Sequence, residues 1–408
     1  MNQKLLAVAV AGLFAAPAFA QTSNVTLYGR ANLGVDQYKA SGATAASSDL
    51  KSRYRIYDSG SRIGVRGIED LGNGLRAVFQ IESGVNVDNG SNTGQAGTQN
   101  FNSGLLASRD SFVGLDGGFG RVTVGRQSIW WANGTLSQTG ANYINAEMPF
   151  LTGSNGRVNM LVARASDVLQ YTIPTFGGFN ATLSYSPNSQ GTGSTSTAGG
   201  FENGEAIQVN RTVNAKIYGA TLRWAGGPIG VQYDYAVKKA NSDAATAVLG
   251  VLPAAGPDAP KNTGHKGLVG WTYMPGGQLT FIGTRLENAN VAGVGSQDLK
   301  QNAYGLNWEH TFGNIQALAQ IGTTGKVSGC TAATVASQCD NSKSKSYMVG
   351  ARYFMSKRTW VYASYNKITN QSNAFMDYTG GNITSNASGA TIAGADPQII
   401  AVGVFHNF

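Results

Sequence analysis

Hydrophobic and polar residues alternate along most of the chain with a period of two. Over residues 25–36, apolar or small side chains occupy every odd position, and polar side chains occupy most of the even ones. Successive side chains of a β-strand point to opposite faces, so each such run predicts a strand with one apolar and one polar face. About sixteen runs of this kind follow one another. They begin near Val25, Arg62, Leu75, Arg109, Arg121, Arg164, Phe179, Ala215, Ile229, Lys266, Leu279, Gln301, Ile315, Lys345, Thr359 and Ile399.

The segments between these runs alternate between short and long. The short ones are glycine-rich turns, which favour tight hairpins; they cover residues 70–74, 116–120, 225–228 and 274–277. The long ones are polar and rich in small residues, and they cover residues 40–60, 186–210, 240–263 and 370–397. Short turns at one rim, long loops at the other and amphipathic strands of roughly ten residues are typical of a transmembrane β-barrel.

The polar face of the strands distinguishes this barrel from a soluble one. A soluble barrel or sandwich needs large apolar side chains in its interior, whereas these runs offer Thr, Ser, Asn, Gln and Arg on the second face. A polar interior predicts a wide, water-filled lumen. Four tryptophans close to short turns predict an aromatic girdle at one membrane interface; they are Trp224, Trp271, Trp308 and Trp360.

Both ends of the chain carry features of an exported protein. Lys4 precedes the apolar run 5–16, and Ala18-Phe19-Ala20 follows it, as in a secretory signal peptide. We therefore expect a signal peptide over residues 1–20 and a barrel domain over residues 21–408; a buried N-terminal helix is the alternative. The last strand ends in Phe408 on the apolar face. This ending resembles the assembly signal of bacterial outer-membrane proteins, although His406 replaces an aromatic residue two positions earlier.

Composition narrows the function classes. The chain has 408 residues, of which only 13% are charged, against about 25% in soluble domains. No run of 18 or more apolar residues lies outside the N-terminus, which excludes a helical membrane protein. The two cysteines, Cys330 and Cys339, fall in an oxidising compartment, so we expect a disulfide that closes a small surface loop. Eight residues separate them and no histidine lies nearby, so a zinc site is not expected. We expect no metal, no cofactor and no nucleic-acid partner.

Several motifs in order resemble one family. Leu27-Tyr28-Gly29-Arg30 opens the first strand, residues 61–67 read SRIGVRG, residues 69–74 read EDLGNG, and residues 108–115 read SRDSFVGL before Gly125-Arg126-Gln127. Together with the strand rhythm, these motifs are similar to the general trimeric porins of Gram-negative bacteria, in particular the β-proteobacterial branch. The resemblance covers the whole chain after the signal peptide.

This resemblance implies a sixteen-stranded antiparallel barrel in the outer membrane, with short periplasmic turns and long extracellular loops. It also implies a homotrimer among outer-membrane lipids and lipopolysaccharide. The third long loop, about residues 127–163, is expected to fold into the lumen and narrow it, with Trp130 and Trp131 packing it against the wall. Such a channel lets small hydrophilic solutes and ions diffuse passively and is not an enzyme.

Charge along the inward face predicts the lining of the constriction. Five arginines fall on the inward parity of their runs: Arg30, Arg62, Arg66, Arg109 and Arg164. In the family, basic residues at the positions matching all of these except Arg66 line the constriction opposite acids on the inserted loop. Here the loop contains a single acid, Glu147, because residues 147–150 read EMPF. An excess of arginine in a narrow pore predicts modest anion selectivity, since low-dielectric walls focus the field.

The sequence leaves alternatives open. Some of the arginines could instead pair with lumenal acids such as Asp36, Glu82 and Asp167. Asp110 and Arg126 fall on the outward parity, where they could meet a neighbouring subunit. A substrate-specific channel for anionic metabolites is the main functional alternative. An outer-membrane barrel enzyme would need a histidine beside a nucleophile or paired carboxylate, which none of the three histidines has; an adhesin built on the barrel is the remaining alternative.

Overall fold

The structure is a computed structural model. It describes residues 23–88, 106–130, 158, 164–187, 207–208, 211–212, 215–240, 261–291, 297–330, 339–378 and 392–408. The predicted signal peptide, Trp131 and Glu147 lie outside these residues. Among the described residues, no helix is both long enough and apolar enough to cross a membrane. The same residues contain no group of three or more His, Cys, Asp or Glu side chains that could hold a metal ion.

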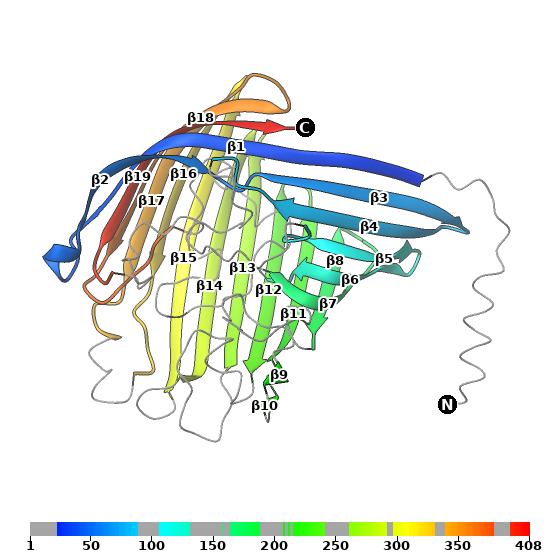
Figure 1. Cartoon of the computed structure of the whole chain (residues 1–408), viewed down its shortest axis with the longest axis horizontal. Coiled ribbons are helices and arrows are strands. Elements are labelled where there is room, and N and C mark those ends of the chain that lie inside the picture. Colours follow the sequence, from blue (N-terminus) through cyan, green and yellow to red (C-terminus); the bar gives the residue numbers. More distant parts are fainter. Residues whose placement is uncertain are drawn as a thin grey trace.

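The chain folds into a closed antiparallel β-barrel of sixteen strands, as the alternating pattern predicts. The strands of the barrel pair in chain order, with β8 next to β11 because β9 and β10 form a separate two-stranded sheet. Figure 1 shows β11 to β18 side by side in the wall. The bounds are β1 Ser23–Ser41, β2 Leu50–Asp58, β3 Arg62–Gly72, β4 Leu75–Gly84, β5 Ser111–Gly117, β6 Gly120–Ser128, β7 Arg164–Thr172, β8 Phe179–Ser186, β9 Ile207–Gln208, β10 Arg211–Thr212, β11 Ala215–Gly226, β12 Ile229–Ala240, β13 Lys261–Met274, β14 Gly277–Val291, β15 Gln297–Phe312, β16 Ile315–Thr324, β17 Ser344–Phe354, β18 Thr359–Asn370 and β19 Asp396–Asn407, with a short 3-10 helix at Ala46–Ser48.

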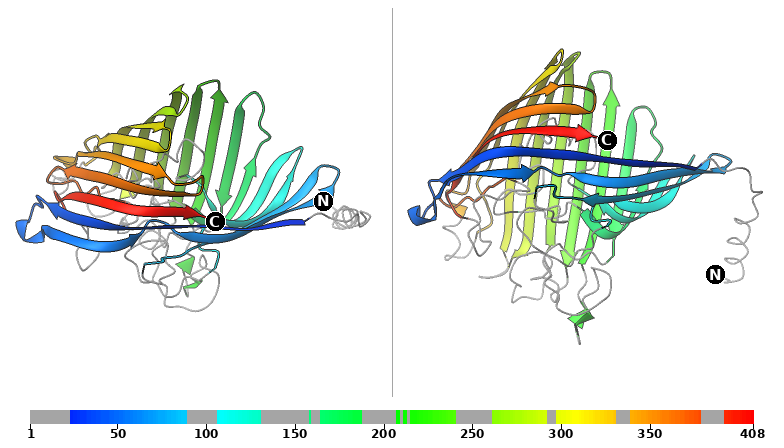
Figure 2. Two further views of the ribbon diagram at one scale, coloured as in Figure 1. Left: turned by 90° about the horizontal axis from the view of Figure 1, so that it is seen from above. Right: turned by 45° about the horizontal axis from the view of Figure 1, so that its top comes forward.

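The barrel closes where the last strand meets the first. β19 pairs with β18 on one side and with β1 on the other, and Figure 2 shows it between them. The C-terminal residue takes part in this seam, because Phe408 and Gly29 exchange two backbone hydrogen bonds of 3.1 Å. Closure satisfies the backbone groups that an open sheet edge would leave unpaired in lipid.

β2 and β3 form one barrel strand with a break. Both pair with β1, and the chain between them stays attached because Ser59 donates its backbone N–H to the Asn32 carbonyl. The predicted long loop over residues 40–60 is therefore wrong, since β1 runs to Ser41 and β2 begins at Leu50. The sequence pattern did not predict this strand, because its inward positions 51, 53 and 55 carry basic side chains and the segment reads as a polar loop. Arg55 is compensated by Asp36, which lies directly opposite on β1 at 3.0 Å.

The predicted glycine-rich turns are confirmed. They join β3 to β4, β5 to β6, β11 to β12 and β13 to β14 at one rim of the barrel. Gly120 shows why glycine is needed there: its φ is +104°, and a Cβ atom would lie 2.4 Å from the Thr172 carbonyl oxygen. The longer connections, including the one between β6 and β7, leave from the other rim.

The two faces of the wall differ as the period predicts. Large apolar side chains are exposed on the outer face, among them Leu27, which is 62% exposed. Trp224 and Trp271 are 43% and 47% exposed near the short turns, as expected of a girdle. The prediction for Trp360 is wrong, because this side chain is 7% exposed and stacks on Phe405 at 3.8 Å. Its neighbour Val361 takes the outward position instead.

Candidate functional site

Arginines from the first strands share one face of the wall. Arg30 of β1 lies directly opposite Arg62 of β3, and Arg66 lies opposite Gln80 of β4. Directly opposite residues in an antiparallel pair point to the same face. The alternate positions on these strands carry exposed apolar side chains such as Leu27. The arginines therefore face the lumen.

Glu82 of β4 stands among these arginines. Its carboxylate pairs with Nε of Arg109 at 2.5 Å and with Nε of Arg62 at 3.7 Å. It also accepts a hydrogen bond of 3.1 Å from the Tyr28 hydroxyl. The Arg66 guanidinium lies over the Tyr28 ring, 5.0 Å from its centroid. One carboxylate thus organises a wall that carries several guanidinium groups, and we call Glu82 with Arg30, Arg62, Arg66 and Arg109 the arginine wall.

The arginine wall retains an excess of positive charge. Burial, together with the charges of Arg164 and Arg62, lowers the pKa of Arg109 to about 10. Arg109 remains protonated at neutral pH, because even this pKa lies well above 7. Among the residues that the structure describes, Glu82 is the carboxylate that Arg62 and Arg109 share. Four guanidinium groups gathered around this carboxylate favour a positive potential in this part of the lumen.

Arg164 occupies a different place from the one predicted. Two residues of β7, Ser166 and Asp167, lie against one residue of β6, so the strand contains a bulge; Asp167 has a φ of +56°. A bulge adds one residue and shifts the alternation, so counting back from Leu169 does not give the face of Arg164. Its Nε pairs with the Asp110 carboxylate at 3.0 Å.

Asp110 connects three segments near the rim of the long loops. Besides Arg164, its carboxylate accepts hydrogen bonds from the backbone N–H of Ser128, at 2.6 Å, and from the Ser128 hydroxyl. Burial by itself raises the pKa of Asp110, but the Arg164 charge and these hydrogen bonds outweigh it, so the pKa lies below its usual value. Asp110 therefore stays ionised, and Arg164 is bound to it within the subunit.

A second charged cluster lies on β11 to β13. Lys266 and Asp234 lie directly opposite each other, and their charged atoms are 3.2 Å apart with both side chains 0% exposed. Asp234 also accepts hydrogen bonds from Thr221, at 2.7 Å, and from Gln232, at 2.8 Å. Lys266 donates a hydrogen bond of 2.9 Å to the backbone carbonyl of Trp130 and lies over its ring. We call Lys266, Asp234 and Trp130 the lysine anchor.

The lysine anchor shows where the chain goes after β6. Trp130 follows the end of β6 by two residues, yet it contacts β13, which is five strands further round the wall. Ile129 packs so closely on β11 that a Cβ atom at Gly219 would lie 2.3 Å from it. The connection between β6 and β7 therefore begins by crossing toward β11–β13 on the inner side of the wall.

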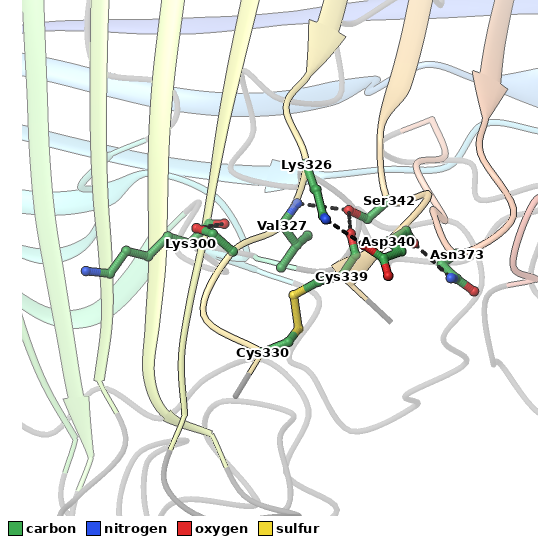
Figure 3. Close-up of a disulfide and its surroundings, with 9 residues drawn as sticks. Lys300, Lys326, Val327, Cys330, Cys339, Asp340, Ser342 and Asn373 are labelled. Carbon is green, nitrogen blue, oxygen red and sulfur yellow. Dashed lines mark hydrogen bonds and ion pairs between the residues drawn. A yellow bond between two sulfur atoms is a disulfide. The ribbon is translucent and has the colours of Figure 1, made fainter. Parts of the chain in front are cut away.

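Apolar residues cover this crossing. Ile129 and Trp130 belong to one buried cluster with Val158 from the same connection and with Cys339. Cys330 and Cys339 form a disulfide across a separation of 9 residues, with Cα atoms 6.1 Å apart (Figure 3). Lys326 pairs with Asp340 beside it. The disulfide itself is thus part of the packing around the lysine anchor, because Cys339 belongs to this cluster and Cys330 packs against it.

The three histidines do not form a catalytic centre. His265 and His310 each bond through Nδ1 to a tyrosine hydroxyl at 2.7 Å, on Tyr233 and Tyr273 respectively. His406 bonds to the Thr359 hydroxyl at 2.9 Å. These contacts place them among aromatic and polar partners of the outer face rather than beside a nucleophile with a paired carboxylate.

Sequence reasoning found some of these residues and missed others. It named Glu82 and Asp36 as acids that could pair with the five inward arginines. Glu82 does pair with Arg62 and Arg109, whereas Asp36 pairs with Arg55, which was not among the five. It missed Lys266 and Asp234, although opposite charges at lumenal positions of successive strands were a readable signal. It placed Asp110 where the side chain could meet a neighbouring subunit, whereas the structure pairs its carboxylate with Arg164 of the same chain.

Comparisons with known proteins agree with this architecture. The family model of the Gram-negative porins matches residues 7–373. Major outer membrane protein P.IB of Neisseria gonorrhoeae is 34% identical over 242 residues, 57% of this chain and 61% of that protein. An outer membrane porin protein of Bordetella pertussis is 32% identical over 271 residues, 62% of this chain and 64% of that protein. The chain thus matches somewhat less than two thirds of the length of these curated relatives.

A solved structure extends the likeness to nearly the whole fold. The anion-selective porin from Comamonas acidovorans superimposes with a TM-score of 0.67, covering 95% of this chain and 100% of that chain at 23% sequence identity. At this identity the match concerns the fold. The family model, by contrast, spans most of the sequence. The chain therefore belongs to the family of Gram-negative porins, proteins of the bacterial outer membrane.

Proposed function

We propose that the barrel is a water-filled channel through which small hydrophilic solutes and ions diffuse passively across the outer membrane, with a modest preference for anions. The arginine wall is the single observation that carries this proposal. It gives the lumen several positive groups around one carboxylate, Glu82. An apolar outer face and a polar inner face suit a barrel that has lipid outside and water inside.

Anion preference follows from the balance of charge. In a lumen with low-dielectric walls, an excess of guanidinium groups raises the local concentration of anions and lowers that of cations. Arg62 and Arg109 share the charge of Glu82. Arg30 donates a hydrogen bond to the Gly60 carbonyl, and Arg66 lies over the Tyr28 ring, and neither of these contacts neutralises a charge. The Comamonas relative in fold is itself described as an anion-selective porin, which agrees with this expectation.

The constriction is proposed to arise from residues 127–163. The contacts of Ile129 and Trp130 with β11 and β13 support a loop that enters the lumen rather than extending outward. In this proposal Glu147 supplies the acid that faces the arginine wall, and Arg164 borders the site through its pair with Asp110. A single loop acid would leave the balance positive.

The proposed assembly is a homotrimer, reached after removal of residues 1–20 and embedded among outer-membrane lipids and lipopolysaccharide. Seam contacts at Phe408 support a role of the C-terminal strand in barrel assembly, because that residue is hydrogen-bonded to the first strand. The Cys330–Cys339 disulfide suits the oxidising periplasm through which such a chain passes.

Single-channel recording in a planar bilayer under a KCl gradient tests the proposal. We expect stepwise openings in groups of three and a reversal potential on the anion side. A clear cation preference would contradict the role of the arginine wall. A folded, heat-modifiable protein without conductance would contradict the channel itself.

A substrate-specific channel for anionic metabolites is the second candidate. It is favoured by the clustering of several guanidinium groups around Glu82, an arrangement that could hold a carboxylate or phosphate. Chloride current that saturates and is blocked by millimolar dicarboxylate or sugar phosphate would support it. A linear, unblocked current would support the general porin.

A further inference from the structure

Three lysines form a row on the outer face of β11, β12 and β13, near the rim of the long loops. Lys216 lies directly opposite Lys239, and Lys239 lies directly opposite Lys261. Their outward direction follows from the strands themselves. Tyr218 lies two positions from Lys216 and Tyr233 six positions from Lys239, so each tyrosine points to the same side of its strand as that lysine. The two tyrosines are 42% and 40% exposed, as other outward side chains of the wall are. We call these three lysines the lysine row.

The lysine row is an unfavourable arrangement for the barrel alone. Directly opposite side chains in an antiparallel pair have Cβ atoms about 4.5–5.5 Å apart, and like charges there are destabilising. Lys239 experiences this repulsion from both sides. Within the part of the chain that the structure describes, none of the three lysines forms an ion pair with a carboxylate. An anion from outside the described chain would remove the repulsion.

Neighbouring charges on the same face are balanced differently. One strand further, Arg285 pairs with Glu287 at 2.9 Å, and Lys300 lies 4.0 Å from the same carboxylate. Other outward lysines lie opposite uncharged residues, since Lys345 faces Thr369 and Lys39 faces Gln398. The lysine row thus combines clustered charge with the lack of a carboxylate partner among the described residues.

Its height on the wall places the lysine row at the membrane surface. On β11, Trp224 stands near the short turns and Lys216 follows eight positions away toward the long loops. At a rise of about 3.3 Å per residue this is about 26 Å along the strand. Strands of such barrels are tilted by roughly 40°, and the apolar band is about 25 Å tall. The lysine row therefore lies close to the upper edge of that band, where lipid headgroups begin.

We propose that the lysine row binds a phosphate group of a phosphorylated glycolipid in the outer leaflet. Three ammonium groups can each donate hydrogen bonds to phosphate oxygens, and the phosphate screens the lysines from one another. The acyl chains of the same lipid would lie along the exposed outer positions below, which include Tyr218 and Tyr233. The proposal rests on the membrane placement in the proposed function, and it does not depend on conduction.

Native mass spectrometry of the purified, delipidated protein in detergent tests this site with lipid A as the probe. We expect the triple variant Lys216→Gln/Lys239→Gln/Lys261→Gln to bind lipid A at least about tenfold more weakly than the unmodified protein. The control variant Lys39→Gln/Lys345→Gln/Lys367→Gln removes the same charge from outward lysines that lie directly opposite uncharged residues. It should bind almost normally, and equal losses in both variants would overturn the proposal in favour of general electrostatic attraction.

Dephosphorylated lipid A and chelation identify the chemistry. Removing the phosphates from the probe should abolish the difference between the triple variant and the unmodified protein. Binding in EDTA should persist, because ammonium groups contact phosphate directly. If lipid A bound only in the presence of a divalent ion, direct phosphate binding would be contradicted. The same holds if the triple variant bound dephosphorylated lipid A as much more weakly than the unmodified protein as it binds lipid A itself.

Thermal stability gives a readout that a purely structural role would not produce. Without lipid, the single variant Lys239→Gln should melt at the same or a higher temperature, because it removes two repulsive contacts. With lipid A, it should gain less stabilisation than the unmodified protein. A loss of stability without lipid, or loss of the trimer, would assign the lysines to packing or to a subunit contact instead. Conductance measured on the same samples separates failure of this site from failure of the channel.

Discussion

The arginine wall and the lysine anchor are both ion-pair clusters on the barrel wall, yet they are built for different ends. In the lysine anchor, one lysine meets one aspartate, both are fully buried, and Thr221 and Gln232 satisfy the remaining carboxylate capacity. In the arginine wall, the single carboxylate of Glu82 contacts two arginines, and other arginines stand beside it. We call the first cluster closed, because its lysine and aspartate pair one to one, and the second open, because two arginines share one carboxylate.

This difference predicts separate roles for the two clusters, one in stability and one in ion selection. A closed, dry pair contributes no net field, but losing one partner leaves a buried charge that is strongly destabilising. An open cluster beside water tolerates change better, because solvent screens what remains. The lysine anchor should therefore control stability and the position of Trp130, while the arginine wall should control which ions pass.

The largest effect is expected at the lysine anchor. Lys266→Met removes the ammonium group that is paired with the buried Asp234 carboxylate, and breaking a buried pair typically costs about 3 kcal/mol or more in the free energy of unfolding. Urea unfolding in lipid vesicles measures this loss. The double variant Lys266→Met/Asp234→Leu should recover much of the stability, because no buried charge is left. An unchanged unfolding midpoint in the single variant would show that the pair is not the closed cluster described above.

Breaking the disulfide should have the next largest effect, and it should change stability but not ion preference. Cys330→Ser/Cys339→Ser removes the covalent link between Cys339, which belongs to the apolar cluster with Trp130, and Cys330, which packs against that cluster. Loop-closure entropy for a loop of this size gives about 2.6 kcal/mol. The unfolding midpoint should fall, while the reversal potential in a KCl gradient stays where it was. A changed ion preference with unchanged stability would link the disulfide to the arginine wall instead.

Substitutions in the arginine wall should change ion preference, and this effect is smaller in free energy than the two effects on stability. Arg62→Gln/Arg66→Gln retains the pair between Arg109 and Glu82 but removes two positive groups from the lumen. We expect the anion-over-cation permeability ratio to fall by about two- to threefold. Lys357→Gln/Arg358→Gln, in the exposed turn between β17 and β18, removes the same charge and is the matched control; it should leave the ratio almost unchanged. Equal shifts in both variants would mean that overall charge, not the wall, sets the preference.

Salt should weaken the preference without any substitution. The Debye length falls from about 10 Å at 0.1 M to about 3 Å at 1 M, so the field of exposed guanidinium groups reaches less of the lumen. The permeability ratio should move toward one as the KCl concentration rises. The stability of the lysine anchor should change little over the same range, because its charges are buried. A ratio independent of salt would point to a specific anion site.

Much of this architecture could be predicted from the sequence because each strand carries its own evidence. Alternation placed Leu27 and Val402 outward and Arg30 and Arg62 on the opposite face, and both assignments hold in the barrel. The alternation fails where the backbone departs from a regular strand. The bulge at Ser166 and Asp167 changes the face on which Arg164 lies. The charged segment of β2 was predicted as a loop, although its Arg55 lies directly opposite Asp36 of β1.

The partners of charged groups required the three-dimensional fold. Trp130 and Lys266 are separated by 136 positions in sequence, and nothing local in either segment indicates their hydrogen bond. The pairing of Asp110 with Arg164 likewise depends on how two segments leave their strands at the rim. Such contacts join distant parts of the chain. The sequence shows which residues are charged, but it does not show which of them pair.

The sequence by itself determined the period-two strands, the number of crossings, the rim that carries the tight turns and the sign of the lumenal charge. These properties depend on residues next to one another, because a strand turns one side chain out and the next one in. The tertiary structure alone decided which charges are closed into buried pairs, where the chain after β6 crosses the barrel, and that three outward lysines stand in one row. Those outcomes depend on register between strands, and register becomes fixed only when the barrel closes.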